Sequence, residues 1–350
     1  MSMKQPKKIL VRGPNPVGDL VMATASFADI RRRFPDATIT LLLKSGREDV
    51  IRGATYYDDV ILDDSSGGLR RLIRLARELR RRRFDLCVLF TQSLRTALLV
   101  ALAGIPLRVG YSKGGQGPLL HRRVKYLRSG RRRIPTSMTE TYARLCEAVE
   151  VERGDGWPQL SLTSECEEAY SERRHELGIA PGEKLVGLVP GASFGSSKLW
   201  PSARLAELSD RVTDRYGLRT IIFAGPGEEK VVAEFFEKVR TKPLYSADRP
   251  LGLDLLKPFV RDLKLLVTMD TGPRHYASAF RVPTLVIMGS TDPRWTASNL
   301  DYQEVVRHDV PCGPCQLKVC PVDHRCMTSI TVDEVMDRIE VLDARLGIFS

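Results

Sequence analysis

The first turn predicted in the chain ends in a carboxylate residue, Asp19. Residues 13–19 read Gly-Pro-Asn-Pro-Val-Gly-Asp and follow an apolar run at 8–13, so Asp19 stands where a strand gives way to a helix-like segment. The turn is not a G-x-G-x-x-G phosphate loop, because its glycine spacing differs and Pro14 and Pro16 lack backbone N–H groups. Asp19 could act as a general base or as a helix N-cap. The sequence leaves both interpretations open.

A second candidate loop combines hydroxyl groups with a cation. Residues 189–201 read VPGASFGSSKLWP after another apolar run. Ser193, Ser196 and Ser197 could donate to phosphate oxygens, and Lys198 could neutralise them. The alternative is an ordinary polar loop with a surface lysine.

A third loop has the form of an anion site. In VTMDTGPRHYASAF, residues 267–280, an apolar strand ends at Asp270, and Thr271 and Gly272 open a helix. The N–H groups of a helix start bind anions, and Gly272 allows close approach. His275 lies one turn further and could face the same ligand, although a single histidine is often structural. A similar turn, MGSTDPRWTA, follows the next strand at residues 288–297.

Parallel sheets would position these loops. Short β-rich runs alternate with segments of helical periodicity, which indicates doubly wound α/β domains. The ten predicted strands are 8–13, 37–43, 59–64, 84–90, 108–111, 184–190, 219–225, 264–270, 283–289 and 304–308. Helical patterns cover 68–83, 202–217 and 228–240.

The two series of strands predict two domains, 1–175 and 176–350, with a polar stretch near 151–182 between them. Ligands of such sheets bind beyond the carboxyl ends of the strands. We therefore expect the site in a cleft between the domains, lined by the candidate loops.

Charge is distributed unequally along the chain. Residues 1–150 carry a net charge of +15 and residues 151–350 a net charge of −4. Arginine runs at 31–33, 80–83 and 131–133 contribute to this, each of which could be a solvated surface. As a whole the basic half favours an anionic partner such as a membrane surface or a phosphorylated acceptor. Nucleic acid is disfavoured, since no zinc-finger spacing or aromatic-interleaved basic patch is present.

Four of the seven cysteines cluster near the C-terminus: Cys312, Cys315, Cys320 and Cys326, with His324 between the last two. The spacing is compact enough for a metal site but matches no standard zinc pattern. Reduced thiols, or disulfides formed on isolation, are the alternatives. No apolar run approaches the length of a membrane span, and no secretory signal is recognised, so a cytoplasmic location is expected.

The motifs together resemble glycosyltransferase family 9, the bacterial ADP-heptose:lipopolysaccharide heptosyltransferases. The resemblance spans nearly the whole chain and is closest to members that add the second inner-core heptose. Five segments carry it, in order: residues 13–37, 102–112, 190–201, 267–280 and 311–331. Met269 departs from the family, where asparagine is common, and Pro273 and Arg274 are unusual in their loop.

The resemblance implies the GT-B fold, two Rossmann-like domains with the acceptor on the first and the donor nucleotide-sugar on the second. It also implies an inverting transfer of heptose that requires no metal or cofactor. Asp19 matches the position of the catalytic base. The positions that match donor contacts are Ser193, Lys198, Glu229, Asp270, Thr271, Gly272 and His275, with Glu228 as an alternative register for the ribose-binding carboxylate.

The implied partners are ADP-heptose and the anionic heptosylated Kdo–lipid A core, at the inner face of the cytoplasmic membrane. Lys113, Arg122 and Arg123 are candidate acceptor contacts, because they follow the predicted strand at 108–111. Alternatives are transfer of the first core heptose or of another sugar, and a non-catalytic sugar-nucleotide binder. A nicotinamide dehydrogenase is disfavoured by the missing glycine fingerprint.

Overall fold

The chain folds into two compact units. The computed structural model describes residues 5–349 except 65–67, 131 and 247. Unit 1 comprises Met1–Ser161 and Arg294–Ser298, and unit 2 comprises Leu162–Pro293 and Asn299–Ser350. The predicted boundary at 175/176 would instead cut helix α6 (Ser164–Glu176), which belongs to unit 2. Packing explains this assignment, because Tyr170 of α6 meets the Phe259 ring edge-on and bonds Asp262 at 2.7 Å.

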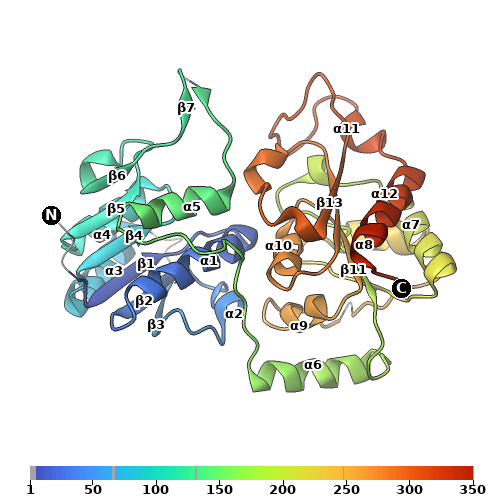
Figure 1. Cartoon of the computed structure of the whole chain (residues 1–350), viewed down its shortest axis with the longest axis horizontal. Coiled ribbons are helices and arrows are strands. Elements are labelled where there is room, and N and C mark those ends of the chain that lie inside the picture. Colours follow the sequence, from blue (N-terminus) through green and yellow to red (C-terminus); the bar gives the residue numbers. More distant parts are fainter. Residues whose placement is uncertain (1–4, 65–67, 131, 247, 350) are drawn as a thin grey trace. The chain divides into compact units, whose positions relative to one another are not determined.

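Unit 1 is built on a six-stranded parallel sheet (Figure 1). Its strands, in spatial order, are β3 (Asp59–Asp63), β2 (Thr38–Lys44), β1 (Lys8–Arg12), β4 (Leu86–Leu89), β5 (Leu107–Tyr111) and β6 (Arg122–Val124). The first five are the predicted strands. The short edge strand β6 was not predicted, because its arginine-rich sequence lacks an apolar signal.

Helices cover both faces of this sheet. On one side lie α1 (Val17–Arg33), α2 (Glu48–Ile51) and α5 (Met138–Glu147), and on the other lie α3 (Leu69–Arg82) and α4 (Leu94–Leu102) (Figure 1). Leu72 and Leu79 of α3 and Val100 of α4 pack in one cluster with the strand residues Leu10 and Leu89. An antiparallel hairpin, β7 (Arg128–Ser129) and β8 (Arg132–Arg133), follows β6. Arg131, in the predicted arginine run at 131–133, lies outside the described residues.

Unit 2 contains a five-stranded parallel sheet. In spatial order its strands are β10 (Thr220–Ile222), β9 (Val186–Leu188), β11 (Leu265–Met269), β12 (Thr284–Met288) and β13 (Gln303–Arg307), and all five correspond to predicted strands. The helices, besides α6, are α7 (Ser202–Tyr216), α8 (Glu229–Phe236), α9 (Leu256–Arg261), α10 (Gly272–Ala279), α11 (Arg325–Thr328) and α12 (Val332–Leu346). Across the described ranges of the chain, no helix has the length and apolarity to cross a bilayer.

The strand order of each sheet reverses next to the candidate loops. In unit 1 the reversal lies between β1 and β4, and in unit 2 between β9 and β11. Ligands of open α/β sheets bind at such switch points, beyond the carboxyl ends of the strands. The Asp19 turn follows β1, the Lys198 loop follows β9 and the Asp270 loop follows β11. Each candidate loop therefore lies at the switch point of its own sheet.

Candidate active site

A buried arginine holds the turn that carries Asp19. Arg12, the last residue of β1, is 3% exposed. Its guanidinium donates to the carbonyl oxygens of Gly13 at 2.6 Å and Leu42 at 3.1 Å, and to Asn15 Oδ1 at 2.9 Å. Burial lowers the pKa of Arg12, and the nearby Asp63 carboxylate opposes this. Arg12 was not predicted as a site residue, although a charged residue at the end of an apolar strand is a usable signal.

Asp19 lies within the first turn of α1. The N-cap of this helix is Pro16, so the interpretation of Asp19 as the N-cap is wrong. The side chain instead accepts a hydrogen bond from Tyr142 of α5. Burial raises the pKa of Tyr142 well above its usual value, and the Asp19 charge raises it further. The tyrosine therefore stays protonated and orients a half-buried carboxylate at the switch point of unit 1.

Lys198 of unit 2 is held in place rather than freely solvated. It ends the short 3₁₀ turn Ser196–Lys198, and its side chain is 12% exposed. The ammonium donates to the main-chain oxygen of Asp270 at 2.6 Å and to its Oδ2 at 2.9 Å. Nζ also lies 5.1 Å from the centre of the Phe194 ring. An ammonium has three N–H donors, and the two bonds to Asp270 leave capacity for an anionic ligand.

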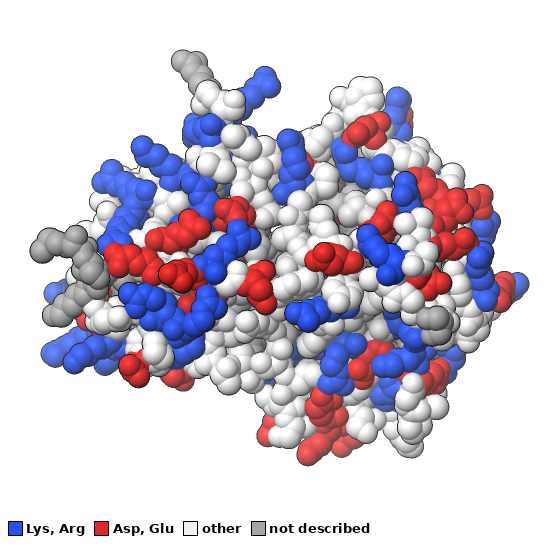
Figure 2. Space-filling view, viewed as in Figure 1, with Lys and Arg blue, Asp and Glu red and all other residues white. Residues whose placement is uncertain are grey.

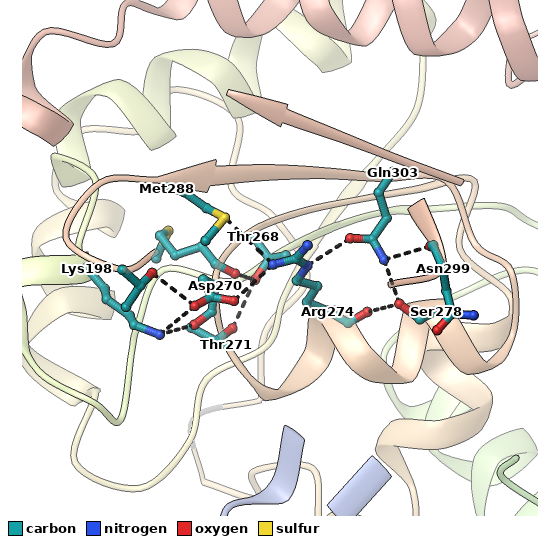
Figure 3. A network of polar contacts seen from close by, with 11 residues as sticks. Lys198, Thr268, Asp270, Thr271, Arg274, Ser278, Met288, Asn299 and Gln303 are labelled. Atoms are coloured by element: carbon teal, nitrogen blue, oxygen red, sulfur yellow. Dashed lines mark hydrogen bonds and ion pairs between the residues drawn. The ribbon is translucent and has the colours of Figure 1, made fainter. Parts of the chain in front are cut away.

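Asp270 is the centre of a polar network (Figure 3). Its Oδ1 accepts from Arg274 at 3.0 Å, and its Oδ2 accepts from Lys198 and, at 3.0 Å, from Thr291. Burial alone would raise the pKa of Asp270, but the charges of Lys198 and Arg274 outweigh it and hold that pKa far below the usual range. Asp270 is therefore an anion at physiological pH, and it fixes the position of two cations.

Arg274 extends the network into the core of unit 2. It is 1% exposed, and its Nε donates to Gln303 Oε1 at 2.8 Å. Gln303 in turn donates to Ser278 Oγ at 2.7 Å, which closes the chain of contacts seen in Figure 3. The sequence marked Arg274 only as unusual, and Thr291 and Gln303 were missed. The spacing of Asp270 and Arg274, four residues apart across a helix start, was the available signal.

Helix α10 starts where the sequence predicted an anion site, but with one backbone donor fewer in its first turn. Thr271 is the N-cap and Gly272 the first helical residue, but Pro273 removes one backbone donor from the first turn. His275 is 7% exposed, and burial together with the Arg274 charge lowers its pKa to about 3. The imidazole is therefore neutral at pH 7. It can offer a hydrogen bond to a phosphate but no charge.

The cysteine-containing segment, residues 312–326, packs against the loop that carries Lys198. Ser197, which is buried, donates its hydroxyl to the Leu317 oxygen at 2.5 Å and its backbone N–H to the Lys318 oxygen at 3.0 Å. A Cβ on Gly195 would lie 2.2 Å from the Lys318 oxygen, so this approach requires glycine. Ser197 is thus occupied by the protein itself, whereas Ser193 is exposed on the same loop.

The four clustered cysteines and His324 line one cavity of about 140 Å³. All four thiols are free, and His324 Nε2 bonds the Ser197 oxygen at 2.8 Å. Within the described part of the chain, no three His, Cys, Asp or Glu side chains are arranged to hold a metal ion. The metal interpretation of Cys312, Cys315, Cys320 and Cys326 remains a hypothesis, while their segment has an observed structural role at the loop.

The two neighbouring glutamates after β10 differ in their surroundings. Glu228 is half-buried, accepts the Gly225 N–H at 2.8 Å and lies so close to Gly191 that a Cβ there would be 2.0 Å from its carboxyl carbon. Burial raises the pKa of Glu228. Glu229 is exposed and bonds only the Gly227 N–H of its own turn among the contacts recorded for it, at 3.0 Å. Glu228, not Glu229, therefore lies against the loop that carries Ser193 and Lys198.

The candidate acceptor residues of unit 1 differ in exposure and direction. Lys113 and Arg123 are exposed. The Arg122 guanidinium donates to the Ala148 oxygen at 2.6 Å, which ties it to the end of α5. Arg122 and Arg123 are successive residues of β6 and so point to opposite faces of the sheet. One ligand cannot be contacted by both from the same face.

Comparison with known proteins agrees with this architecture. A model described as Glycosyltransferase family 9 (heptosyltransferase) matches residues 72–325. The chain is 25% identical to lipopolysaccharide heptosyltransferase 2 of Escherichia coli strain K12 over 353 residues, which covers 96% of this chain and 98% of that protein.

Two solved structures show the same fold. The family 9 glycosyltransferase of Veillonella parvula matches with a TM-score of 0.82 and 22% identity, over 97% of this chain and 98% of that one. The E. coli ADP-heptose lps heptosyltransferase II matches with a TM-score of 0.76 and 22% identity, over 97% and 99%. The predicted GT-B fold, a pair of Rossmann-like units, is thereby confirmed, and the chain belongs to glycosyltransferase family 9.

Proposed function

We propose that this glycosyltransferase moves L-glycero-D-manno-heptose from ADP-heptose to the heptosyl-Kdo2-lipid A inner core, with inversion at the anomeric carbon. The observation that carries the proposal is the Lys198–Asp270–Arg274 group at the switch point of unit 2. It offers a fixed cation beside a helix start where a nucleoside diphosphate would bind. The full-length relatives named lipopolysaccharide heptosyltransferase 2 support the choice of sugar and acceptor.

Unit 2 supplies the donor contacts in this proposal. Lys198 and the N–H groups at Thr271 and Gly272 bind the diphosphate, with hydrogen bonds from Ser193 and the neutral His275. Glu228 is the better candidate than Glu229 for the ribose hydroxyls, because it lies against the loop of Lys198. Asp270 and Arg274 do not contact the donor and act by positioning Lys198 and α10.

Unit 1 supplies the base. Asp19 accepts the proton of the acceptor hydroxyl while that oxygen forms its bond to the anomeric carbon. The bond from this carbon to the diphosphate oxygen breaks at the same time, and ADP leaves with the electron pair. Attack opposite the leaving group inverts the configuration. Lys198 and the helix start stabilise the negative charge that develops on the departing diphosphate, the task a divalent cation performs in other transferases.

The acceptor is polyanionic, which suits the basic unit 1, and it is anchored in lipid. We propose accordingly that the protein works in the cytoplasm, at the inner face of the cytoplasmic membrane. Lys113 and either Arg122 or Arg123 are the candidate acceptor contacts.

The test is a transfer assay with purified protein. ADP-heptose should yield heptosylated product on heptosyl-Kdo2-lipid A, at an unchanged rate after treatment with a chelator. Other nucleotide-sugars and the acceptor lacking the first heptose form the comparison panel. Preference for a different donor or acceptor would redirect the assignment within the family, and donor binding without any transfer would indicate a sugar-nucleotide binder.

A further inference from the structure

Helix α3 presents a stripe of arginines to solvent. Arg70, Arg74, Arg77 and Arg81 are all exposed and recur at the spacing that places residues on one face of a helix. The buried residues Leu72, Ala76 and Leu79 lie on the opposite face. Among the described residues, no ion pair is formed by any of these four arginines. Arg82, by contrast, pairs with Asp59 and Glu78, so the arginine run at 80–83 is not uniformly free.

Helix α4 presents a ridge of leucines. Leu94, Leu98 and Leu102 are 51%, 37% and 46% exposed, each four residues from the next. Thr96, Ala97, Leu99 and Val100 form the buried side of the helix. The exposed leucines therefore point away from the sheet, as the arginine stripe of α3 does. Three large apolar side chains in one row on a short helix need a partner more than scattered surface leucines do.

The two helices form one layer. They pack against each other on the same face of the unit 1 sheet (Figure 1). Their outward surface thus places a basic stripe beside an apolar ridge. The face of unit 1 drawn in Figure 2 differs, since Lys and Arg are interspersed there with Asp and Glu.

The charge of this outward surface indicates which partner binds it. Helix α4 contains no acidic residue. The acidic residue of α3, Glu78, already forms an ion pair with Arg82. A second copy of the chain paired through this face would bring arginines together without acidic partners. An anionic lipid surface matches both components, because its headgroups attract arginines and its acyl boundary accepts leucines.

We propose that the outward surface of α3 and α4 docks unit 1 on an anionic phospholipid bilayer, with Leu94, Leu98 and Leu102 entering the acyl boundary and Arg70, Arg74, Arg77 and Arg81 contacting phosphate headgroups. Its biological purpose rests on the proposed function, since a lipid-anchored acceptor must be met at a membrane. The docking surface shares no residue with the Asp19 turn or with the candidate donor loops.

The experiment is co-sedimentation with vesicles of phosphatidylglycerol and phosphatidylethanolamine, against vesicles of phosphatidylcholine, across a salt series. Arg74→Gln with Arg77→Gln should lower partitioning to anionic vesicles roughly 25-fold, about five-fold for each arginine. Leu94→Gln, Leu98→Gln and Leu102→Gln together should abolish the part of the binding that persists at high salt. ADP affinity and melting temperature should match the wild type in both variants.

Control variants of the same kinds of change lie on unit 2. Lys238→Gln with Lys242→Gln removes two exposed charges, and Val341→Gln changes an exposed apolar residue of α12. These should bind vesicles as the wild type does. The proposal would be overturned if the control variants lost as much vesicle binding as the α3 and α4 variants. It would also be overturned if both the α3 variant and the α4 variant bound vesicles as the wild type does. A change of oligomeric state in the leucine variant would overturn it as well and would assign the face to a second copy.

A transfer assay on a soluble, delipidated acceptor separates this proposal from the proposed function. If docking is wrong but the function holds, transfer persists and vesicle binding is insensitive to the α3 and α4 changes. If the function is wrong but docking holds, vesicle binding shows the expected losses and no heptose is transferred.

Discussion

Two aspartates at the two switch points show how differently the same residue type can be used. Asp270 of unit 2 has a side chain only 10% exposed and is bonded by Lys198 and Arg274. Asp19 of unit 1 is half-buried and accepts a hydrogen bond from the hydroxyl of Tyr142. Both follow a parallel strand at the point where strand order reverses.

The difference lies in the partners. A carboxylate between two cations is a poor proton acceptor, because its anionic form is strongly stabilised. Its value is to fix the cations. The recorded donor to Asp19 is a neutral hydroxyl, which holds a carboxylate in place without adding a formal charge. Asp270 is therefore a positioning group, whereas the role of base that we propose for Asp19 needs a carboxylate that can reach an acceptor hydroxyl.

The largest effect is expected at Asp19. Asp19→Asn keeps the shape and removes the base, so turnover should fall roughly 10²- to 10⁴-fold. ADP affinity, measured by calorimetry, should be unchanged because all the donor contacts that we propose lie on unit 2. Turnover close to wild type would show that Asp19 is not the base.

A substitution of Arg274 tests the positioning role of Asp270. Arg274→Met leaves Asp270 buried with one cation fewer, and the free energy of unfolding should drop by about 3 kcal/mol in a denaturant titration. Arg338→Met is the matched control, since Arg338 forms an exposed pair with Glu304 at 3.4 Å and should cost less than about 1 kcal/mol. Equal losses in the free energy of unfolding would mean that the network around Asp270 stabilises the protein no more than an exposed ion pair does.

Lys198 should matter for ADP binding as well as for folding, because its loss also leaves Asp270 with one cation fewer. Lys198→Ala removes the charge-assisted contact that we propose to the diphosphate, and ADP affinity should weaken roughly 10- to 100-fold. Thr291→Val, which removes a different partner of Asp270, serves as the comparison and should weaken ADP binding less. An unchanged dissociation constant for Lys198→Ala would place the diphosphate elsewhere.

The smallest effect separates the two glutamates. Glu228→Gln should weaken ADP binding about five-fold through the weaker bond to the ribose hydroxyls, whereas Glu229→Gln should leave it unchanged. Titration of both variants with ADP under one set of conditions gives the answer. The reverse pattern would restore Glu229 as the ribose contact.

The sequence predicted all ten strands that position the loops, because continuous apolar runs bounded by turns are a strong signal for parallel sheets. It also placed Lys198, Asp270 and Gly272 at the ends of those strands. It missed β6, where arginines replace the apolar pattern, and its domain boundary at 175/176 left all but the last residue of α6 in the first domain. The side that a connecting helix joins depends on long-range packing, here of Tyr170 on Phe259.

The hydrogen-bond partners of the site residues could not be predicted from the sequence. Tyr142 lies far from Asp19 in the chain, and Gln303 far from Arg274, so only the folded structure brings them together. The register at Glu228 and Glu229 was open for the same reason, since which carboxylate turns toward Gly191 depends on where α8 begins.

The central claim is that unit 2 holds the donor nucleotide and unit 1 supplies the base. Amide hydrogen exchange of the wild-type protein, with and without saturating ADP, tests it most directly. We predict slower exchange in residues 193–198 and 271–276 of unit 2, and a smaller change or none in residues 13–20 of unit 1. Protection at 13–20 with none in either loop of unit 2 would contradict the account.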